Sequence, residues 1–225
     1  MYRDARGAVV VTYNDGVGAD TFNIGLCPWQ SPWCARYCYG RKLRGLAYSC
    51  DWHADFEWGS YAKKRGFFRP FTVEGDVPKT AQDRRRCTLL LRKLLPQYDR
   101  VWLPTRAWSD TRGLPYLHGL MEEHENVRLT LSYDGSMNLQ ELRRVAQLLS
   151  NRFPERIGAT VVVDAPYTPL FEQRNVDALM NLGSTPCTKT NKNGECDDCG
   201  RICWNGGAKL NGMLEVPLVA LKFHP

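Results

Sequence analysis

The stretch that begins with "RVWLPT" at residues 100–105 decides the fold class, because strand and helix patterns alternate along it. "NVRLTLSY" (residues 126–133) and "RIGATVVVDAP" (residues 156–166) are further strand candidates, and helix patterns at residues 113–124 and 138–153 separate the three strands. The run "ATVVV" is apolar without alternation, as is typical of parallel strands that are covered on both faces. The alternation therefore predicts an α/β fold, either a partial (βα) barrel or an open parallel sheet.

Similar patterns extend outward from this stretch. Residues 79–95 predict an amphipathic helix with Pro78 in its N-terminal turn, and the side chains at helical spacing are Cys87, Leu90, Leu91 and Leu94. A short β-branched run predicts a strand at residues 8–14. The remaining predictions are helices at 40–50 and 171–183 and a strand at 213–224, which Pro217 would confine to a sheet edge.

Length and composition favour a single domain without a membrane span. The 225 residues suit one α/β domain, 1–225, with residues 187–204 as a cysteine-rich metal-binding insertion. Of all residues, 43% are hydrophobic and 24% charged, and no apolar stretch is long enough to cross a membrane. The short apolar run near the N-terminus is followed by polar residues and does not resemble a secretory signal. We therefore expect a cytoplasmic protein.

Cysteine usage points to metal ligation. The chain has nine cysteines, an odd number, and no secretion signal, which argues against a disulfide scaffold and for reduced thiols. Seven of the nine cysteines fall into two groups, whereas Cys50 and Cys87 are isolated. Because Cys87 lies among leucines in a helix pattern, we expect it to be a small core residue.

The first group lies in "CPWQSPWCARYCYGRK" and consists of Cys27, Cys34 and Cys38, with six and then three residues between them. It follows an extended segment, and functional groups of parallel α/β sheets gather at the carboxyl ends of strands. Three thiolates can hold three irons of a cubane cluster and leave the fourth iron open to a substrate or cofactor. Zinc is the competing ligand, but catalytic zinc sites usually include His, and the first His after the group is His53.

The second group has eight, two and three residues between its members, which are Cys187, Cys196, Cys199 and Cys203. Four cysteines so close together, with glycines that permit tight turns, predict a metal site. Only the pair Cys196 and Cys199 has the spacing of a zinc-ribbon knuckle. Structural zinc, a second iron-sulfur cluster, and completion of the first site all remain open.

Four segments together resemble a group of bacteriophage-encoded, cysteine-rich proteins regarded as radical S-adenosylmethionine (SAM)-like. These segments are "CPWQSPWCARYCYGRK", "WLPTRAWSD", "CTKTNKNGECDDCGRICW" and "VALKFH". The resemblance spans most of the chain, and its specific parts are the cysteine blocks. It implies a partial (βα) barrel and a [4Fe-4S] cluster on Cys27, Cys34 and Cys38. For a phage-encoded protein it also implies the host cytoplasm.

The resemblance further implies SAM as a cofactor. Tyr37 matches the aromatic position where a ring packs near the bound cofactor, and SAM would chelate the open iron. A redox-active cluster would also need an electron donor. The chain departs from the usual radical-SAM loop, in which three and then two residues separate the cysteines. It also lacks a Gly-Gly-Glu segment after the second strand, where "VEGDVP" and "WSD" are faint counterparts.

Residues 36–69 predict a nucleic-acid partner. This stretch holds eight basic and three acidic residues, and aromatic residues are interleaved with them. Cations that meet phosphates and rings that stack on bases form the usual surface for single strands. The structural alternative is an aromatic core edge with a solvated basic face. A zinc-stabilised nucleic-acid-binding protein without catalysis is accordingly the second functional hypothesis, and an enzyme acting on a nucleobase would combine the two.

Single residues after predicted strands form the last set of candidates. Asp110 and Asp164 each follow a strand, where a cofactor contact or a catalytic acid would lie, although Asp at this position is often a helix cap. His224, beside the last predicted strand, is a weaker candidate. The basic run Arg84 to Arg86 is expected to be a solvated helix face.

Overall fold

The structure is a computed structural model. It describes residues 9–14, 18–22, 27–32, 34, 55–59, 61–62, 66–71, 75–134 and 136–161, together with the backbone of 162–163, 185–186, 210–211 and 216–222. Several predictions lie outside these residues: the helices at 40–50 and 171–183, and the positions Tyr37, Cys38, Cys50, Asp164, Cys187, Cys196, Cys199, Cys203 and His224.

All described strands belong to one sheet, with the order β3-β1-β2-β4-β5-β6-β7-β10-β8 and with β9 paired to β10. The strands are β1 (Val9–Asn14), β2 (Ala19–Thr21), β3 (Phe56–Trp58), β4 (Phe67–Phe68), β5 (Arg100–Thr105), β6 (Val127–Tyr133), β7 (Ile157–Val163), β8 (Thr185–Pro186), β9 (Leu210–Asn211) and β10 (Val216–Lys222). The three strands of the deciding stretch are therefore confirmed as β5, β6 and β7.

Most of this open sheet is parallel. Every neighbouring pair from β2 through β4, β5, β6, β7 and β10 to β8 is parallel, whereas β1 with β2 and β9 with β10 are antiparallel. The α/β class and the open parallel sheet are thus confirmed, with antiparallel pairs that make the sheet mixed. From β2 to β10 the neighbours also follow chain order, apart from the short strands β3, β8 and β9.

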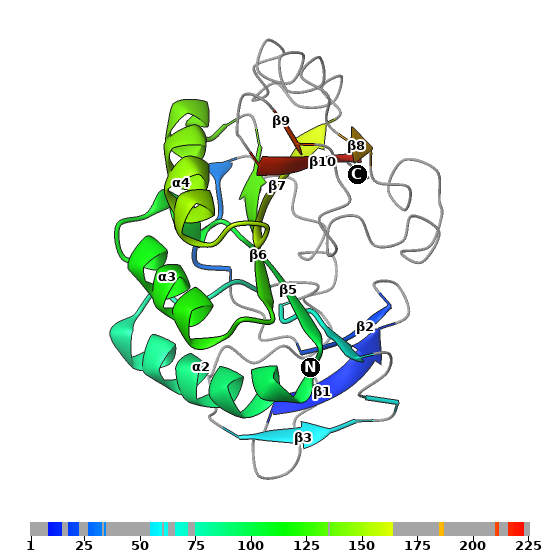
Figure 1. Ribbon diagram of the computed structural model, residues 1–225. Coiled ribbons are helices and arrows are strands. Elements are labelled where there is room, and N and C mark those ends of the chain that lie inside the picture. The colour runs from blue at the N-terminus through cyan, green and yellow to red at the C-terminus, as the bar shows by residue number, and fades with distance from the viewer. Residues whose placement is uncertain are drawn as a thin grey trace.

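Three helices connect the parallel strands. They are α2 (Ala81–Leu94), α3 (Gly113–Glu123) and α4 (Leu139–Arg152), and short 3₁₀ turns occupy Leu95–Gln97 and Ala107–Ser109. Figure 1 shows the three helices side by side on one face of the sheet. Right-handed crossovers that always step in the same direction place their helices on the same face, so the consecutive strand order explains this arrangement.

In helix α2, the residues at helical spacing form the face that packs against the sheet. Its buried residues are Cys87, Leu90, Leu91 and Leu94, each 0% exposed, so the helical spacing and the core position of Cys87 are confirmed. The helix begins at Thr80, whose hydroxyl accepts the N–H of Asp83 at 3.1 Å, and Pro78 lies before this cap. Burial of each of these leucines contributes about 2 kcal/mol, which holds α2 against the sheet.

The prediction that Pro217 places the last strand at an edge is wrong. Strand β10 lies between β7 and β8, and its ladder with β7 runs over Leu218–Lys222. Pro217 precedes this ladder and pairs with Leu210 of β9. A proline at the beginning of a strand removes no hydrogen bond from the ladder that follows, so the strand can occupy the sheet interior.

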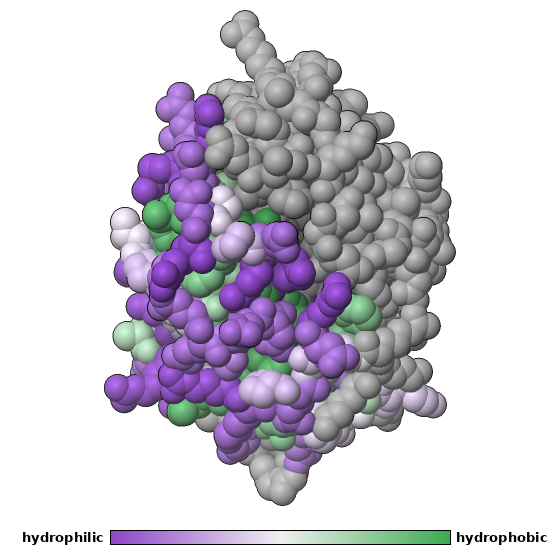
Figure 2. All heavy atoms as spheres, in the orientation of Figure 1, coloured by the Kyte–Doolittle hydropathy of each residue, from purple (hydrophilic) through white to green (hydrophobic). Residues whose placement is uncertain are grey.

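The visible surface of the described part is mostly hydrophilic, with smaller hydrophobic areas between the charged side chains (Figure 2). Large exposed hydrophobic residues are scattered in the sequence: Trp58, Tyr61, Leu89 and Leu148. Among the described residues, no helix is both long and apolar enough to cross a membrane.

Candidate metal centre at the carboxyl edge of the sheet

Two of the three cysteines of the first group are described. Cys27 and Cys34 are thiols of intermediate burial. They follow β2, the first strand of the consecutive parallel series, so this part of the group does come after a strand as predicted. The backbone is helical at Cys34, which the sequence reasoning had assigned to a loop.

Arg106 is the cation of this edge. It follows β5 directly, and its side chain is 21% exposed. Burial by itself would lower the pKa of Arg106, but Cys34, Asp134, Asp76 and Cys27, in that order of strength, raise it overall. Both described thiols therefore lie close enough to the guanidinium to interact with its charge. A nearby arginine favours the thiolate form that binds metals.

Asp134 connects Arg106 to the cysteine segment. It follows β6, is 0% exposed, and its Oδ2 lies 3.6 Å from Nε of Arg106. The same Oδ2 accepts the hydroxyl of Ser31 at 2.5 Å, and the hydroxyl of Ser31 accepts the backbone N–H of Cys34 at 3.0 Å. A continuous polar chain thus joins Cys34, through Ser31 and Asp134, to the arginine after the neighbouring strand.

Asp76 supports the other side of Arg106. Its carboxylate accepts the hydroxyl of Thr105, the N–H of Arg106 at 2.8 Å and the N–H of Val77 at 2.7 Å. Burial raises the pKa of Asp76 to about 6, and these hydrogen bonds and Arg106 limit the rise. Because its oxygens are engaged by the protein, Asp76 positions the turn after β5 and is poorly placed to bind a ligand.

Further contacts hold the edge together. The indole of Trp29 donates to the carbonyl of Val77 at 2.6 Å, so the cysteine segment is tied to the connection after β4. Lys79 lies over the ring of Trp29, with 5.2 Å between Nζ and the ring centroid. In the turn after β5, a Cβ on Gly113 would lie 2.1 Å from the carbonyl oxygen of Ala107, so only glycine fits there. The backbone around the site is therefore closely packed.

Two possible sulfur ligands are described at this edge. A metal there would find soft donors in Cys27 and Cys34 and a positive charge in Arg106. Within the described residues, no group of three or more His, Cys, Asp or Glu side chains could hold a metal ion. The third predicted ligand, Cys38, lies outside the described residues, as do all four cysteines of the second group.

Asp110 lies at the entry to α3, where the helix-cap alternative for this residue would place it. Its carboxylate accepts the backbone N–H of Arg112 at 2.8 Å and pairs with the guanidinium of the same residue at 3.2 Å. These hydrogen bonds lower the pKa of Asp110. Its carbonyl oxygen also accepts the N–H groups of Gly113 and Leu114 at the beginning of α3. Asp110 thus shapes the helix entry, and a cofactor contact from it stays a prediction.

Sequence reasoning missed Arg106, Asp134, Asp76 and Ser31. A usable signal was present for two of them, because Arg106 and Asp134 are each the first residue after a predicted strand. The rule that pointed to Asp110 and Asp164 therefore applies more directly to these two. Asp76 and Ser31 lie in irregular segments, where neither periodicity nor spacing distinguishes a site residue from a turn residue.

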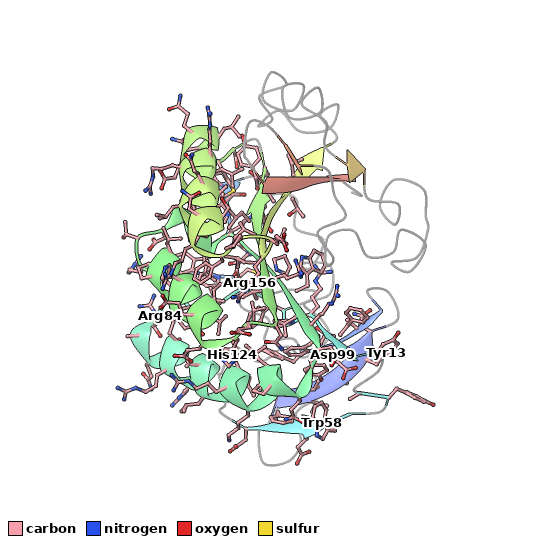
Figure 3. All side chains as sticks on the ribbon, viewed as in Figure 1. Tyr13, Trp58, Arg84, Asp99, His124 and Arg156 are labelled. Carbon is pink, nitrogen blue, oxygen red and sulfur yellow. The ribbon has the colours of Figure 1, made fainter. Side chains whose placement is uncertain are left out.

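The amino ends of the parallel strands, opposite the candidate site, have a structural role. Arg156 precedes β7, and its guanidinium donates to three backbone carbonyls, those of Val127, Met121 and His124. Figure 3 shows Arg156 and His124 beside α3. Burial lowers the pKa of both side chains. This arginine therefore ties the end of α3 to the beginning of β6 through their backbone carbonyls.

The described part of residues 36–69 contributes both core and surface. Phe68 is 0% exposed and stacks on Tyr98 with ring centroids 4.7 Å apart, whereas Tyr61 is 75% exposed. Arg69 lies over the ring of Trp102 at 4.3 Å. The predicted aromatic core edge is therefore present among these residues, and the nucleic-acid partner stays a prediction.

No protein-family model matches the chain, and neither a curated protein nor a solved structure gives a significant match. The proposal below therefore depends on the chemistry and topology of the site itself.

Proposed function

We propose that this chain is an iron-sulfur protein of the radical-SAM-like type, with a [4Fe-4S] cluster held by Cys27, Cys34 and Cys38. The observation that carries the proposal is the position of Cys27 and Cys34 after β2, where Ser31 and Asp134 connect the backbone at Cys34 to Arg106 after β5. In α/β proteins of this winding, cofactors bind at the carboxyl edge of the sheet. Three thiolates would leave one iron open to a second ligand.

The winding of the sheet supports the partial-barrel part of this proposal. Neighbouring strands from β4 to β7 follow chain order, and α2, α3 and α4 cover one face. A doubly wound sheet reverses its order in the middle and has helices on both faces, whereas a barrel does neither. The described sheet is open, and the order of its strands from β4 to β7 supports the proposed winding of a barrel segment.

The surrounding residues fit such a cluster. When bound, it would supply one-electron transfer, with the electron coming from a reduced low-potential donor protein. Arg106 would balance part of the negative charge of the thiolates, and Ser31 would orient the backbone at Cys34. SAM is proposed as the second ligand, with Tyr37 beside it. The substrate is proposed to be a nucleic acid or a nucleobase, because of the basic and aromatic stretch 36–69.

The second cysteine group is proposed as a separate metal centre, of zinc or iron-sulfur type. Strand β8 ends directly before Cys187, and β9 begins at Leu210, after Cys203. Both strands pair with β10, so the segment between them leaves from and returns to the same part of the sheet. This placement supports a self-contained metal-binding insertion at 187–204.

Anaerobic purification followed by iron, sulfide and zinc analysis tests the proposal. We expect brown protein with iron and sulfide in equal amounts, and colourless protein that contains only zinc would overturn the cluster assignment. Cys34→Ala should abolish the cluster absorbance, and Cys196→Ala should remove only the distal metal. Cys87→Ala is the matched control, because this thiol is 0% exposed in the core and its loss should leave both metals in place.

The zinc-stabilised nucleic-acid-binding protein is the second candidate, and the 75% exposure of Tyr61 favours it. An exposed ring beside a basic stretch can stack on an unpaired base. Binding of a labelled single strand should then weaken steeply as the salt concentration rises. Tyr61→Ser should reduce the affinity several-fold, whereas Leu148→Ser, another exposed apolar position at 50% exposure, should not. Absence of binding at low salt would remove this candidate.

A further inference from the structure

We propose that the exposed face of α2 and the adjoining end of β3 together bind a single-stranded nucleic acid. Arginines of the helix contact phosphates, and Trp58 and Tyr61 stack on bases. The inference rests on the proposed function only for the class of substrate, because it depends on neither the cluster nor any cysteine. It also gives a role to the basic run Arg84 to Arg86, for which the sequence pattern alone indicated a solvated helix face.

Helix α2 has an excess of positive charge on its outer face. Its sequence contains five basic residues and one acidic residue, and the acidic residue, Asp83, accepts the hydroxyl of the capping Thr80 at 2.7 Å. Arg85 and Arg86 are exposed, whereas the opposite face of the helix is buried in the core. A basic cluster of this kind attracts a polyanion, and a nucleic acid that meets it releases counterions from its phosphates.

The charge of Arg85 is available to such a ligand. Its side chain has no hydrogen-bond or ion-pair partner among the residues that the structure describes. Arg84, by contrast, donates to the carbonyl oxygen of Arg112 at 3.1 Å. Arg92 binds both carboxylate oxygens of Glu123. Because no described contact of the fold uses the guanidinium of Arg85, this group can be removed without disturbing the helix.

The second half of α2 adjoins β3. Nζ of Lys93 lies 2.6 Å from Oδ1 of Asp55, the residue directly before β3, and both side chains are at least half exposed. Trp58 at the end of β3 contacts the ring of Tyr98, with 6.3 Å between the ring centroids. Figure 3 shows Arg84 near the beginning of α2 and Trp58 near its other end. The cations and the rings therefore lie on adjoining elements.

The two rings are presented to solvent in defined orientations. Trp58 is 39% exposed and packs edge-on against Phe56, with 5.1 Å between the ring centroids. Tyr61 is 75% exposed, and its φ of 63° lies in the left-handed region, which bulky residues rarely adopt. A strained backbone that exposes an aromatic ring favours binding over packing as the reason for its conformation. Unpaired bases stack on such rings, whereas a duplex hides the faces of its bases.

The same features distinguish this surface from a membrane-binding helix. Such a helix buries a broad apolar face in the lipid, whereas the outer face of α2 has one large exposed hydrophobic residue, Leu89. An acyl layer would find a single anchor here. A single strand finds both cations for its phosphates and rings for its bases, so the nucleic acid is the better match.

The test measures binding of the full-length protein to a labelled single strand over a range of salt concentrations. A strand of about 20 nucleotides is longer than the ~4–16 nucleotides that one single-strand-binding fold covers. Arg85→Gln removes one charge from the surface, and Tyr61→Ser removes a ring and no charge. Arg143→Gln is the matched control, because Arg143 is also exposed and has no partner within the described part of the chain. It lies on α4, and α3 separates that helix from α2 (Figure 1).

We expect Arg85→Gln to weaken binding several-fold. It should also reduce the slope of log affinity against log salt concentration by about 0.7, since one phosphate contact is lost. Tyr61→Ser should weaken binding and leave the slope unchanged, and Arg143→Gln should behave like the wild-type protein. An unchanged affinity and slope in Arg85→Gln would overturn the inference, and so would equal losses in Arg85→Gln and Arg143→Gln.

Two other ligands complete the test. A duplex that binds as tightly as the single strand would contradict the stacking role of the rings, and binding to phosphatidylserine vesicles alone would assign the basic face to a membrane. Iron and sulfide analysis of the same protein separates this inference from the proposed function. Iron-containing wild-type protein that binds no strand at low salt contradicts this inference alone. Zinc-only protein that binds the strand as expected contradicts the cluster alone.

Discussion

The two ends of the sheet use arginine in opposite ways. At the amino end, Arg156 donates to the carbonyls of Val127, Met121 and His124. At the carboxyl end, Arg106 is surrounded by acids and thiols, and its buried Nε has no hydrogen-bond acceptor among the described residues. Burial lowers the pKa of Arg156, whereas the anions around Arg106 raise its pKa.

This difference separates a structural cation from a candidate functional one. The hydrogen bonds of Arg156 satisfy backbone groups of the fold, so its contribution is to stability. The environment of Arg106 combines negative charge with incomplete hydrogen bonding, which is typical of sites that bind a further group. Mutations at the amino end should therefore change the free energy of unfolding, whereas mutations at the carboxyl end should also change the binding of a metal.

The largest effect on stability is expected at the amino end. Arg156→Ala removes the charged donor of three carbonyls and should lower the free energy of unfolding by about 4 kcal/mol. Urea denaturation measures this change, and the metal content of the folded fraction should not change. Arg152→Ala is the control, because its 65% exposed side chain pairs with Glu122 at the surface and its loss should matter little. Equal destabilisation by both variants would contradict the structural role of Arg156.

The second effect is a pH dependence at the carboxyl end. Because burial raises the pKa of Asp76 from 3.8 to about 6, the folded chain binds more protons than the unfolded chain between these values. The contribution of Asp76 is therefore fully present below pH 3.8 and is lost as pH rises through 6. Roughly two pKa units correspond to about 3 kcal/mol.

Asp76→Asn removes this titration. Denaturation at several pH values should show that the stability of the wild-type protein falls relative to the variant between pH 4 and pH 7. The comparison cancels the contributions of the surface carboxylates that both proteins share. Parallel stability curves over this range would show that Asp76 does not titrate with a raised pKa.

The comparison of the two ends also shows which parts of the structure can be predicted from the sequence. The strands β5, β6 and β7 and the helices between them follow from local periodicity, which depends on residues close together in the chain. Core positions such as Leu90 and Leu94 follow from the same pattern. The neighbours of Arg106 do not, since Ser31, Asp76 and Asp134 come from three separate connections.

One prediction from the local sequence pattern, the position of the last strand in the sheet, is wrong. Pro217 indicated an edge strand, but β10 lies inside the sheet because its ladder with β7 begins after the proline. For the cysteine groups, local spacing is the only basis of the prediction that they bind metal. Which cysteines share one centre depends on tertiary contacts, and sequence spacing contains no information about these.

A smaller effect is expected where the cysteine segment meets β6. Ser31→Ala removes the donor to Oδ2 of Asp134 and the acceptor of the Cys34 N–H, and it should destabilise the fold by about 2 kcal/mol. Unlike Arg156→Ala, it should also lower the retention of iron, because the backbone at Cys34 loses its support. Iron analysis after gel filtration measures this. Ser150→Ala, at an exposed hydroxyl on α4, should change neither quantity.

The smallest effect on stability is expected in the segment that joins β6 to α4, where Asn138 and Asp134 can be compared. Asn138 caps α4 by accepting the N–H of Glu141 at 3.1 Å, whereas Asp134, four residues earlier, holds Ser31. Asn138→Ala should lower stability by about 1 kcal/mol, as the loss of a helix cap does. Its iron retention should equal that of the wild-type protein, because the cap contacts the helix and Asp134 contacts the site. Loss of iron in this variant would mean that the whole connection, and not the Ser31–Asp134 contact, supports the cysteine segment.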